Sequence, residues 1–249
     1  MNEKQILGSH TAKNGFKNED DIVEKFNNWE KDKDAQLWLT IMNFKLIEIE
    51  YVEAVKIPGY KTDVQVQVEI KIKKAIDVEN LQVKLVSNIK GFNQIDKRWV
   101  DNYNSMWDMP KNVISIFKRY TGEVAPDIKK PKDNRRMFFN EFSDLEQSII
   151  INWLKKNQSL IVSDILKGRG KFAAEWMLVA QKTEKNARWT LKPMNFCLNY
   201  FGNGPIVISP RGTIKIGRIT MQRKGGDNGR ESAEMLQFKI NPAELFDLL

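Results

Sequence analysis

A strict alternation of apolar and polar residues after Asp63 constrains the fold of this chain more than any other feature. The apolar positions are Val64, Val66, Val68, Ile70 and Ile72, and the polar positions between them are Gln65, Gln67, Glu69 and Lys71. A period of two is typical of a β-strand with one buried face. The pattern therefore predicts that a β-sheet forms part of the structure.

A second, shorter alternation follows at Leu81–Val86. Leu81, Val83 and Leu85 share one face of the predicted strand, while Gln82 and Lys84 share the other. The intervening residues Lys73–Asn80 are expected to hold the turn, although they lack the Asn-Gly signature of a tight hairpin.

Helical spacing occurs in three other regions. Residues 18–31 predict an amphipathic helix with Asn18 as N-cap, and a second helix is expected to follow Pro110 and to end before Gly122. After a loop over Glu123–Arg136, the capping box of Ser143 and Glu146 predicts a third helix that runs to about residue 157.

The last third of the chain again shows the spacing of strands. Thr213–Arg223 alternates with a change of phase at Gly217, which favours a β-bulge, and Met235–Ile240 alternates without interruption. Asn241 and Pro242 then predict the start of a short C-terminal helix. Because helices and strands are mixed throughout the 249 residues, the sequence indicates one α/β domain over residues 1–249.

Cysteine and histidine are too rare for several kinds of chemistry. Cys197 and His10 are the single residues of their types, so an internal disulfide, a cysteine-based zinc site and any mechanism with two histidines are excluded. No apolar run approaches the roughly 20 residues that span a membrane, and the N-terminus lacks the pattern of a secretory signal. We therefore expect a cytoplasmic protein without a membrane partner.

Positive charge is concentrated in two segments. The chain carries 40 Lys and Arg against 32 Asp and Glu, a net charge of +8, and residues 129–136 and 211–230 each contain a single acid among five or six basic side chains. Such segments suit contacts with a nucleic acid, but they are equally compatible with a solvated surface.

Three polar residues on the two predicted strands form a candidate catalytic centre. A turn near Lys73–Ile76 would set Asp63 opposite about residue 86, within reach of Lys84. Asp63, the amide oxygen of Gln82 and the carbonyl of Val83 could bind Mg²⁺, which prefers hard oxygen ligands. Lys84 could orient or help deprotonate a water that attacks a phosphodiester. The alternative is an ordinary solvated strand face.

Two further segments contain residue types that suit DNA recognition. In the first, Phe92 could insert between bases while Gln94 and Lys97 reach groove edges, or Phe92 could anchor the loop in the core. In the second, the glycine-rich run from Gln222 to Arg230 has the side chains that read base edges, but it could also be a flexible hairpin. Its candidate contacts are Gln222, Arg223, Lys224, Asp227, Asn228 and Arg230. The segment Lys167–Lys171 is a third candidate for phosphate contact.

Several longer blocks of sequence resemble the HinP-type restriction endonucleases, small type II enzymes of the PD-(D/E)xK superfamily that cut GCGC. The densest of these blocks are GYKTD, QVKLVSN, GFNQIDKRW, DILKGRGKFAAEW, NARW, SPRGT and QRKGGDNGRE. The resemblance implies a mixed central β-sheet flanked by helices, with a catalytic centre around 63–84 and DNA-reading segments around 91–99 and 211–230.

The resemblance also implies roles for individual residues. Asp63 and Gln82 match metal ligands, Lys84 matches the catalytic lysine, and Glu19 matches a carboxylate that often lies near such sites. The loop with Phe92, Gln94 and Lys97 corresponds to one that enters distorted DNA, and the segment from Gln222 to Arg230 corresponds to one that reads the major groove.

The function expected from this resemblance is Mg²⁺-dependent hydrolysis of double-stranded DNA at a palindromic tetranucleotide, leaving 5′-phosphate and 3′-hydroxyl ends. No obligate protein partner is expected, and a weak homodimer is possible. Two rival hypotheses remain: a strand-nicking repair relative that needs partner proteins, and a DNA-binding protein of the same fold whose neutral Gln82 marks a lost active site.

Overall fold

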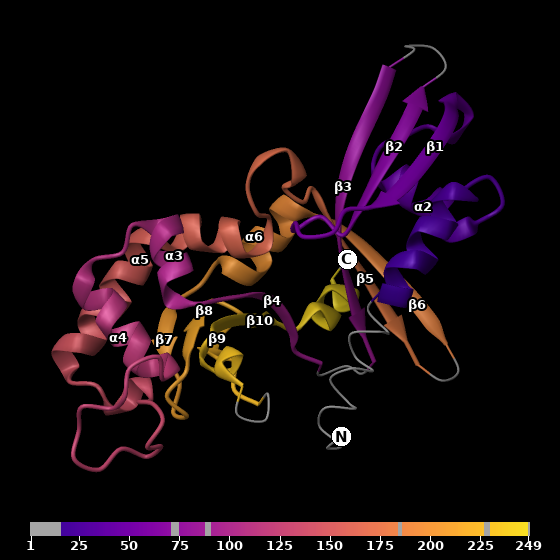
Figure 1. The fold of residues 1–249 in the computed structure, drawn as a ribbon. Coiled ribbons are helices and arrows are strands. Elements are labelled where there is room, and N and C mark those ends of the chain that lie inside the picture. Colours follow the sequence, from indigo (N-terminus) through magenta and orange to yellow (C-terminus); the bar gives the residue numbers. More distant parts are fainter. Residues whose placement is uncertain (1–15, 71–74, 88–90, 184–185, 227–229, 249) are drawn as a thin grey trace. The chain divides into compact units, whose positions relative to one another are not determined.

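The computed structural model describes residues 16–70, 75–87, 91–183, 186–226 and 230–248. They form two compact units, each with its own five-stranded sheet (Figure 1). The first unit comprises Met1–Asn93, Leu166–Cys197 and Asn241–Leu249, and the second comprises Gln94–Ile165 and Leu198–Ile240. The prediction that the chain is one domain stays a prediction.

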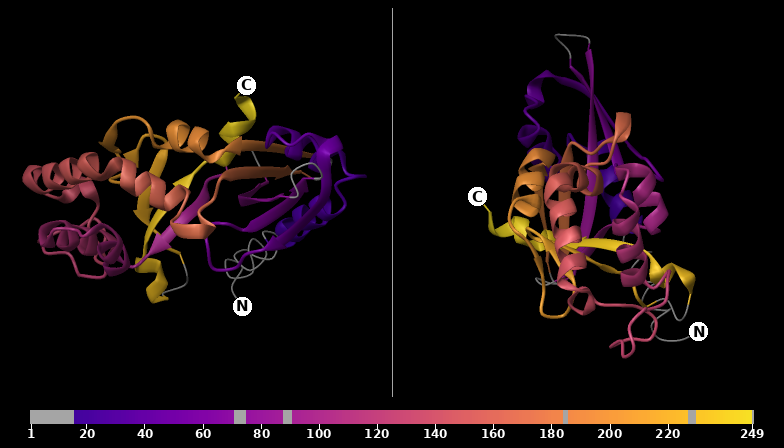
Figure 2. Two further views of the ribbon diagram at one scale, coloured as in Figure 1. Left: turned by 90° about the horizontal axis from the view of Figure 1, so that it is seen from above. Right: turned by 90° about the vertical axis from the view of Figure 1, so that its left-hand side faces the viewer.

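The sheet of the first unit has the strand order β1-β2-β3-β5-β6. Its strands are β1 (Ile49–Lys56), β2 (Val64–Ile70), β3 (Ala75–Val86), β5 (Trp176–Lys182) and β6 (Ala187–Pro193). β3 and β5 are parallel, whereas the other neighbours are antiparallel, so the predicted mixed sheet is confirmed. In both views of Figure 2 the purple strands β1, β2 and β3 lie side by side.

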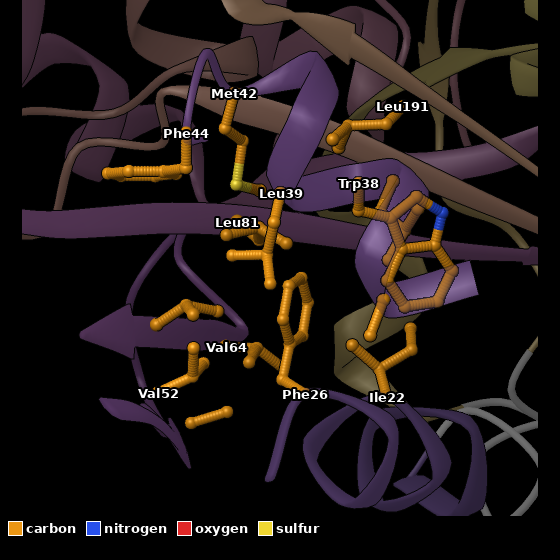
Figure 3. Packing of buried hydrophobic residues seen from close by; sticks show 14 of the residues in the cluster. Ile22, Phe26, Trp38, Leu39, Met42, Phe44, Val52, Val64, Leu81 and Leu191 are labelled. Atoms are coloured by element: carbon orange, nitrogen blue, oxygen red, sulfur yellow. The ribbon is translucent and has the colours of Figure 1, made fainter. Parts of the chain in front are cut away.

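Helices cover one face of this sheet. A helix over residues 16–27 and α2 (Lys33–Ile41) direct Ile22, Phe26 and Trp38 onto buried residues of the strands (Figure 3). The strand residues in this core include Val52, Val64, Val66, Leu81, Val83, Leu178 and Leu191. The rings of Phe26 and Trp38 lie 5.3 Å apart, centroid to centroid. Val64 and Leu81 therefore face the helices, and the residues that alternate with them face the opposite side.

The sheet of the second unit has the order β4-β10-β9-β8-β7. Its strands are β4 (Asn93–Arg98), β7 (Ile206–Ile208), β8 (Ile214–Ile216), β9 (Ile219–Arg223) and β10 (Leu236–Ile240). The helices that follow β4 are α3 (Val100–Trp107), α4 (Lys111–Thr121) and α5 (Asp144–Leu166), and α6 is Met194–Gly202. Edge-to-face aromatic contacts join α3 to the sheet. Tyr103 and Trp107, for example, both contact Phe238 of β10.

Several predicted elements are confirmed. α4 follows Pro110 and ends at Gly122, and Ser143 and Glu146 form both hydrogen bonds of the capping box at the start of α5. The strand predicted over Met235–Ile240 corresponds to β10, and the predicted C-terminal helix is a 3-10 helix over Pro242–Asp247.

Three predicted boundaries are wrong. The helix predicted over 18–31 stops at residue 27, because Asp32 caps a separate helix by accepting hydrogen bonds from the backbone N–H groups of Asp34 and Ala35. The third helix continues to Leu166 rather than ending near residue 157. β3 begins at Ala75, so residues 75–80 belong to the strand and not to the predicted turn.

The bulge predicted at Gly217 is also wrong, because the chain reverses direction there. Ile216 pairs with Ile219, so Gly217 and Arg218 form a two-residue connection between β8 and β9. Gly217 has φ +55°, and a Cβ on it would lie 2.8 Å from the carbonyl oxygens of Phe201 and Asn203. A phase change at a glycine is compatible with either structure, and the sequence pattern alone does not distinguish them.

Candidate active site and DNA-reading surface

The register of β2 and β3 brings Asp63 and Gln82 together. Val64 pairs with Leu81 in the antiparallel ladder, so Asp63 lies opposite Gln82 and not opposite residue 86 as predicted. The backbone N–H of Asp63 donates to the carbonyl of Leu81 over 2.8 Å, which keeps Asp63 bound to β3 next to the first paired residue of β2. Gln82 and Lys84 share the sheet face opposite the helices, and the carboxylate of Asp63 lies within electrostatic reach of Lys84.

The side chain of Asp63 takes the place that a backbone carbonyl of a neighbouring strand would have beside Val83. The backbone N–H of Val83 donates to Oδ2 of Asp63 over 2.6 Å, just beyond Val64, the first residue of β2. The N–H and C=O groups of one strand residue point to the same side. The carbonyl of Val83 therefore faces the same edge as the Asp63 carboxylate, and the two oxygens can share one cation.

Gln82 contributes a buried oxygen without a partner. Its side chain is 2% exposed, and within the described residues its Oε1 has no hydrogen-bond partner. A buried amide oxygen left without a partner costs free energy, on the order of 1–3 kcal/mol. A bound cation would satisfy this oxygen, so the residues at this position fit a metal ion.

Glu19 belongs to the same cluster although it lies on the first helix. Burial, and after it the charge of Asp63, raises the pKa of Glu19 to about 7, while Lys56 and Lys84 act in the opposite direction. Burial also raises the pKa of Asp63, against the effect of the positive charge of Lys84. Two half-buried carboxylates beside a lysine are thus concentrated at one end of the sheet.

The groups that could bind a metal ion in this cluster are all oxygen atoms. Among the described residues, no group of three or more His, Cys, Asp and Glu side chains converges on a point. Two carboxylates, one amide oxygen and one backbone carbonyl would leave two positions of an octahedral Mg²⁺ ion for water, and oxygen ligands of this kind suit Mg²⁺. His10 lies outside the described residues.

The predicted DNA-reading residues are distributed over both units. Phe92, in the first unit, is 57% exposed, which favours the wedge over the core anchor. Gln94 and Lys97 are exposed on β4 of the second unit, and Gln222 is half-buried on β9. Asp227 and Asn228 lie outside the described residues.

Glutamine side chains follow one another across three strands of the second sheet. Gln237 of β10 pairs with Gln222 of β9, and its Nε2 donates to Oε1 of Gln94 over 2.7 Å. Gln237 is buried, and it was not among the predicted site residues because its alternation in the sequence marks only a strand. The pairing that brings it to Gln94 depends on sheet order, which no local pattern encodes.

Positive side chains lie beside these amides. Burial, and after it the charges of Lys97 and Arg230, lowers the pKa of Lys224. Clustered cations repel one another, and a polyanion such as DNA relieves that repulsion.

Arg223 differs from its neighbours because its guanidinium is buried. Its Nε donates to the carbonyl oxygen of Thr121, and its guanidinium lies 3.9 Å from a carboxylate oxygen of Glu234. Burial, followed by the charges of Arg136 and Arg135, lowers its pKa. The two basic segments of the sequence, 129–136 and 211–230, therefore meet in the second unit, with Arg223 held by internal partners.

Comparison with known proteins gives the family. The family model described as R.HinP1I restriction endonuclease matches residues 42–246. The chain belongs to the R.HinP1I restriction endonuclease family. It is thus a type II restriction endonuclease, a site-specific nuclease that binds DNA. Glu19 precedes the matched range. Its proposed role therefore rests on the resemblance described in the sequence analysis and on its electrostatic interaction with Asp63.

A solved structure supports the fold of this family member. The restriction endonuclease MspI, solved in complex with its cognate DNA, is 14% identical in sequence, with a TM-score of 0.63 over 90% of this chain and 88% of that one. Both have the α/β architecture of restriction endonucleases. A search of curated proteins found no match. Within the described residues, no helix is long and apolar enough to cross a membrane.

Proposed function

We propose that this restriction endonuclease hydrolyses double-stranded DNA at GCGC and uses Mg²⁺. The observation that carries the metal assignment is the buried Oε1 of Gln82, which has no partner among the described residues and belongs to the residue opposite Asp63. The choice of GCGC rests on the family resemblance of the sequence blocks described above.

Each residue of the cluster has a distinct proposed role. Asp63, Gln82, the carbonyl of Val83 and Glu19 would hold the metal ion. When bound, Mg²⁺ supplies positive charge that stabilises the negative charge developing on the phosphate. Lys84 would orient the attacking water and offset the same negative charge.

The chemistry requires one water for each bond that is broken. Water adds to phosphorus in line with the departing 3′ oxygen, and that oxygen leaves with a proton as the 3′-hydroxyl. The phosphate stays on the 5′ end. Because one centre cuts one strand, a palindromic site needs two sequential nicks or two protomers, and a weak homodimer on DNA would supply the second centre.

The test is incubation of the purified protein with plasmid DNA and Mg²⁺, with EDTA as control, followed by mapping of the ends. We expect Mg²⁺-dependent fragments that end at GCGC, and we expect Lys84→Ala to bind DNA without cutting it. Fragments at another tetranucleotide would overturn the specificity alone. Nicks that need added repair proteins, or an intact plasmid with bound protein, would overturn the proposed mechanism.

A further inference from the structure

The segment Lys167–Phe172 lies against the same sheet face as the candidate active site. Nδ2 of Asn80 donates to the carbonyl of Lys171 over 3.0 Å, and Asn80 is the residue of β3 that precedes Gln82 on that face. Oγ1 of Thr62, the neighbour of Asp63, donates to the carbonyl of Phe172 over 2.9 Å. Two hydrogen bonds thus attach this segment to β3 and to the residue that precedes Asp63.

The amide of Asn80 is itself held in place. Nε2 of Gln65 donates to its Oδ1 over 3.0 Å, and its backbone N–H donates to Glu175 over 3.1 Å. Gln65 lies opposite Asn80 in the ladder, one step beyond the pair of Asp63 and Gln82 on the same face. The attachment point is therefore a buried, satisfied network rather than a surface contact.

Two glycines give the segment its shape. Gly168 has φ +81° and Gly170 has φ +75°, a region that side chains disfavour. A Cβ on Gly168 would lie 2.6 Å from Cγ of Lys61, so a glycine is needed where the segment passes this lysine. A Cβ on Gly170 would meet nothing within 4 Å, so that part of the backbone faces open space.

Basic side chains and an aromatic pair complete the surface. Arg169 and Lys171 are exposed on either side of Gly170. Tyr60 packs on Phe172 with ring centroids 4.4 Å apart, and Nζ of Lys171 lies 4.8 Å from the centroid of the Phe172 ring. The positive charge of Lys61 reaches Asp63, where it acts against the raised pKa of that carboxyl.

We propose that Arg169 and Lys171 bind backbone phosphates of the DNA next to the phosphodiester that is cut. This inference rests on the proposed function, because it needs the scissile phosphate at Asp63. Ammonium and guanidinium groups beside an open glycine backbone are suited to phosphate oxygens. The segment therefore holds the strand against the catalytic face of β3.

The test measures how DNA binding depends on salt. A duplex with one GCGC site is titrated from 50 to 200 mM salt, with Ca²⁺ in place of Mg²⁺ to prevent cleavage, for the wild type and for the double variant Arg169→Gln, Lys171→Gln. Each lost phosphate contact reduces the slope of log K against log salt by about 0.9, so we expect a reduction of about 1.8.

Two further variants separate a local contact from a general loss of charge or fold. The double variant Lys33→Gln, Lys45→Gln removes the same charge from exposed residues at α2 and just after it, and it should keep the wild-type slope. Arg169→Lys with native Lys171 keeps both charges and should keep the slope as well. An unchanged slope for the first double variant, or an equal loss in the control, would overturn the proposal. Failure of the wild type to bind the duplex would instead overturn the proposed function.

Discussion

The carboxylate of Asp63 accepts a hydrogen bond from the backbone N–H of Val83 over 2.6 Å, where β3 extends beyond Val64, the first residue of β2. A side chain thereby takes the place of a strand partner, and the residue proposed to bind the metal also completes the sheet. Substitutions at Asp63 must therefore separate a catalytic effect from a structural one.

Asp63→Asn separates the two effects, because an amide oxygen can still accept the Val83 N–H but carries no charge for a metal ion. We expect cleavage to fall at least about 10³-fold, since metal stabilisation of the transition state is worth several kcal/mol and each 1.36 kcal/mol is tenfold. The melting temperature should change little. Asp101→Asn, which removes an exposed carboxylate in the second unit, should cleave normally. An equal loss of cleavage in Asp63→Asn and Asp101→Asn would contradict the assignment of Asp63 as a metal ligand.

Gln82→Glu is expected to tighten metal binding. A carboxylate at this buried position replaces a dipole with a charge beside Asp63, so the Mg²⁺ concentration for half-maximal cleavage should fall about tenfold or more. Without metal, the added charge should lower the melting temperature. Gln65→Glu adds the same charge one step along the face and should shift the Mg²⁺ midpoint less. An unchanged midpoint in Gln82→Glu would exclude Gln82 as a ligand.

The pKa of Glu19 predicts how stability depends on pH in the metal-free protein. Burial and the charge of Asp63 raise this pKa from 4.5 to about 7, so the folded state binds the proton more tightly than the unfolded state. Its stabilising contribution is complete below pH 4.5 and is lost as the pH rises through 7.

Glu19→Gln mimics the protonated side chain and should remove this dependence. With EDTA present, the variant and the wild type should melt alike near pH 4.5. At pH 8 the variant should melt about 2–4 °C higher, which corresponds to about 1 kcal/mol after screening by solvent. If the difference in melting temperature between the variant and the wild type stays constant from pH 4.5 to 8, the pKa of Glu19 is not raised in the folded state.

Arg223 and Lys224 are neighbours with different expected effects. Arg223→Met removes a buried donor to Thr121 and the partner of Glu234, so we expect a loss of about 2 kcal/mol and a melting temperature about 4–8 °C lower. Lys224→Gln should leave the melting temperature nearly unchanged and reduce the salt slope of DNA binding by about 0.9. The reverse assignment of the two effects would mean that Arg223 contacts DNA directly.

Gln237 is expected to control base discrimination through Gln94. Its Nε2 donates to Oε1 of Gln94, which fixes the orientation of the Gln94 amide. Gln237→Leu removes this restraint, so kcat/KM at GCGC relative to sites with one changed base pair should fall about tenfold, within the 1–3 kcal/mol of a good base contact. The salt slope should stay constant. A uniform loss at all sites would contradict a positioning role.

Periodicity in the sequence predicts the elements whose buried face is apolar. The alternation after Asp63 and the helical spacing at α4 both give one apolar face, and both elements are found. By contrast, the first half of β3 carries Asp77, Glu79 and Asn80, so its residues resemble a turn until the pairing with β2 is known. The segment with Gln94 and Lys97 is predicted as a loop, and this is wrong, because Asn93–Arg98 forms strand β4. The sequence patterns predict none of the strands β1, β5, β6 and β7 and none of the helices α2, α3 and α6.

The candidate site likewise has one part that the local sequence pattern predicts and one part that it does not. Gln82 and Lys84 share a face because of local alternation, which the sequence contains, whereas Asp63 comes beside them through the pairing of β2 with β3. Their register depends on where the chain turns, and the attachments of Asn80 and Thr62 to Lys171 and Phe172 join residues about 90 and 110 positions apart. Such contacts depend on topology, and a single sequence does not specify topology locally.

The parallel pairing of β3 with β5 has a consequence for synthesis of the enzyme. Nearly 90 residues separate Val86 from Trp176, and the last segment of the first unit, from Asn241, packs against β5 and β6 only after β9 and β10 have been translated. Closing so long a loop is slow compared with local folding. All five strands of the catalytic sheet are translated by Pro193, but the first unit is complete only when the segment from Asn241 has been added. By then the chain already contains the strands proposed to read the DNA, so the complete catalytic unit never precedes them during synthesis.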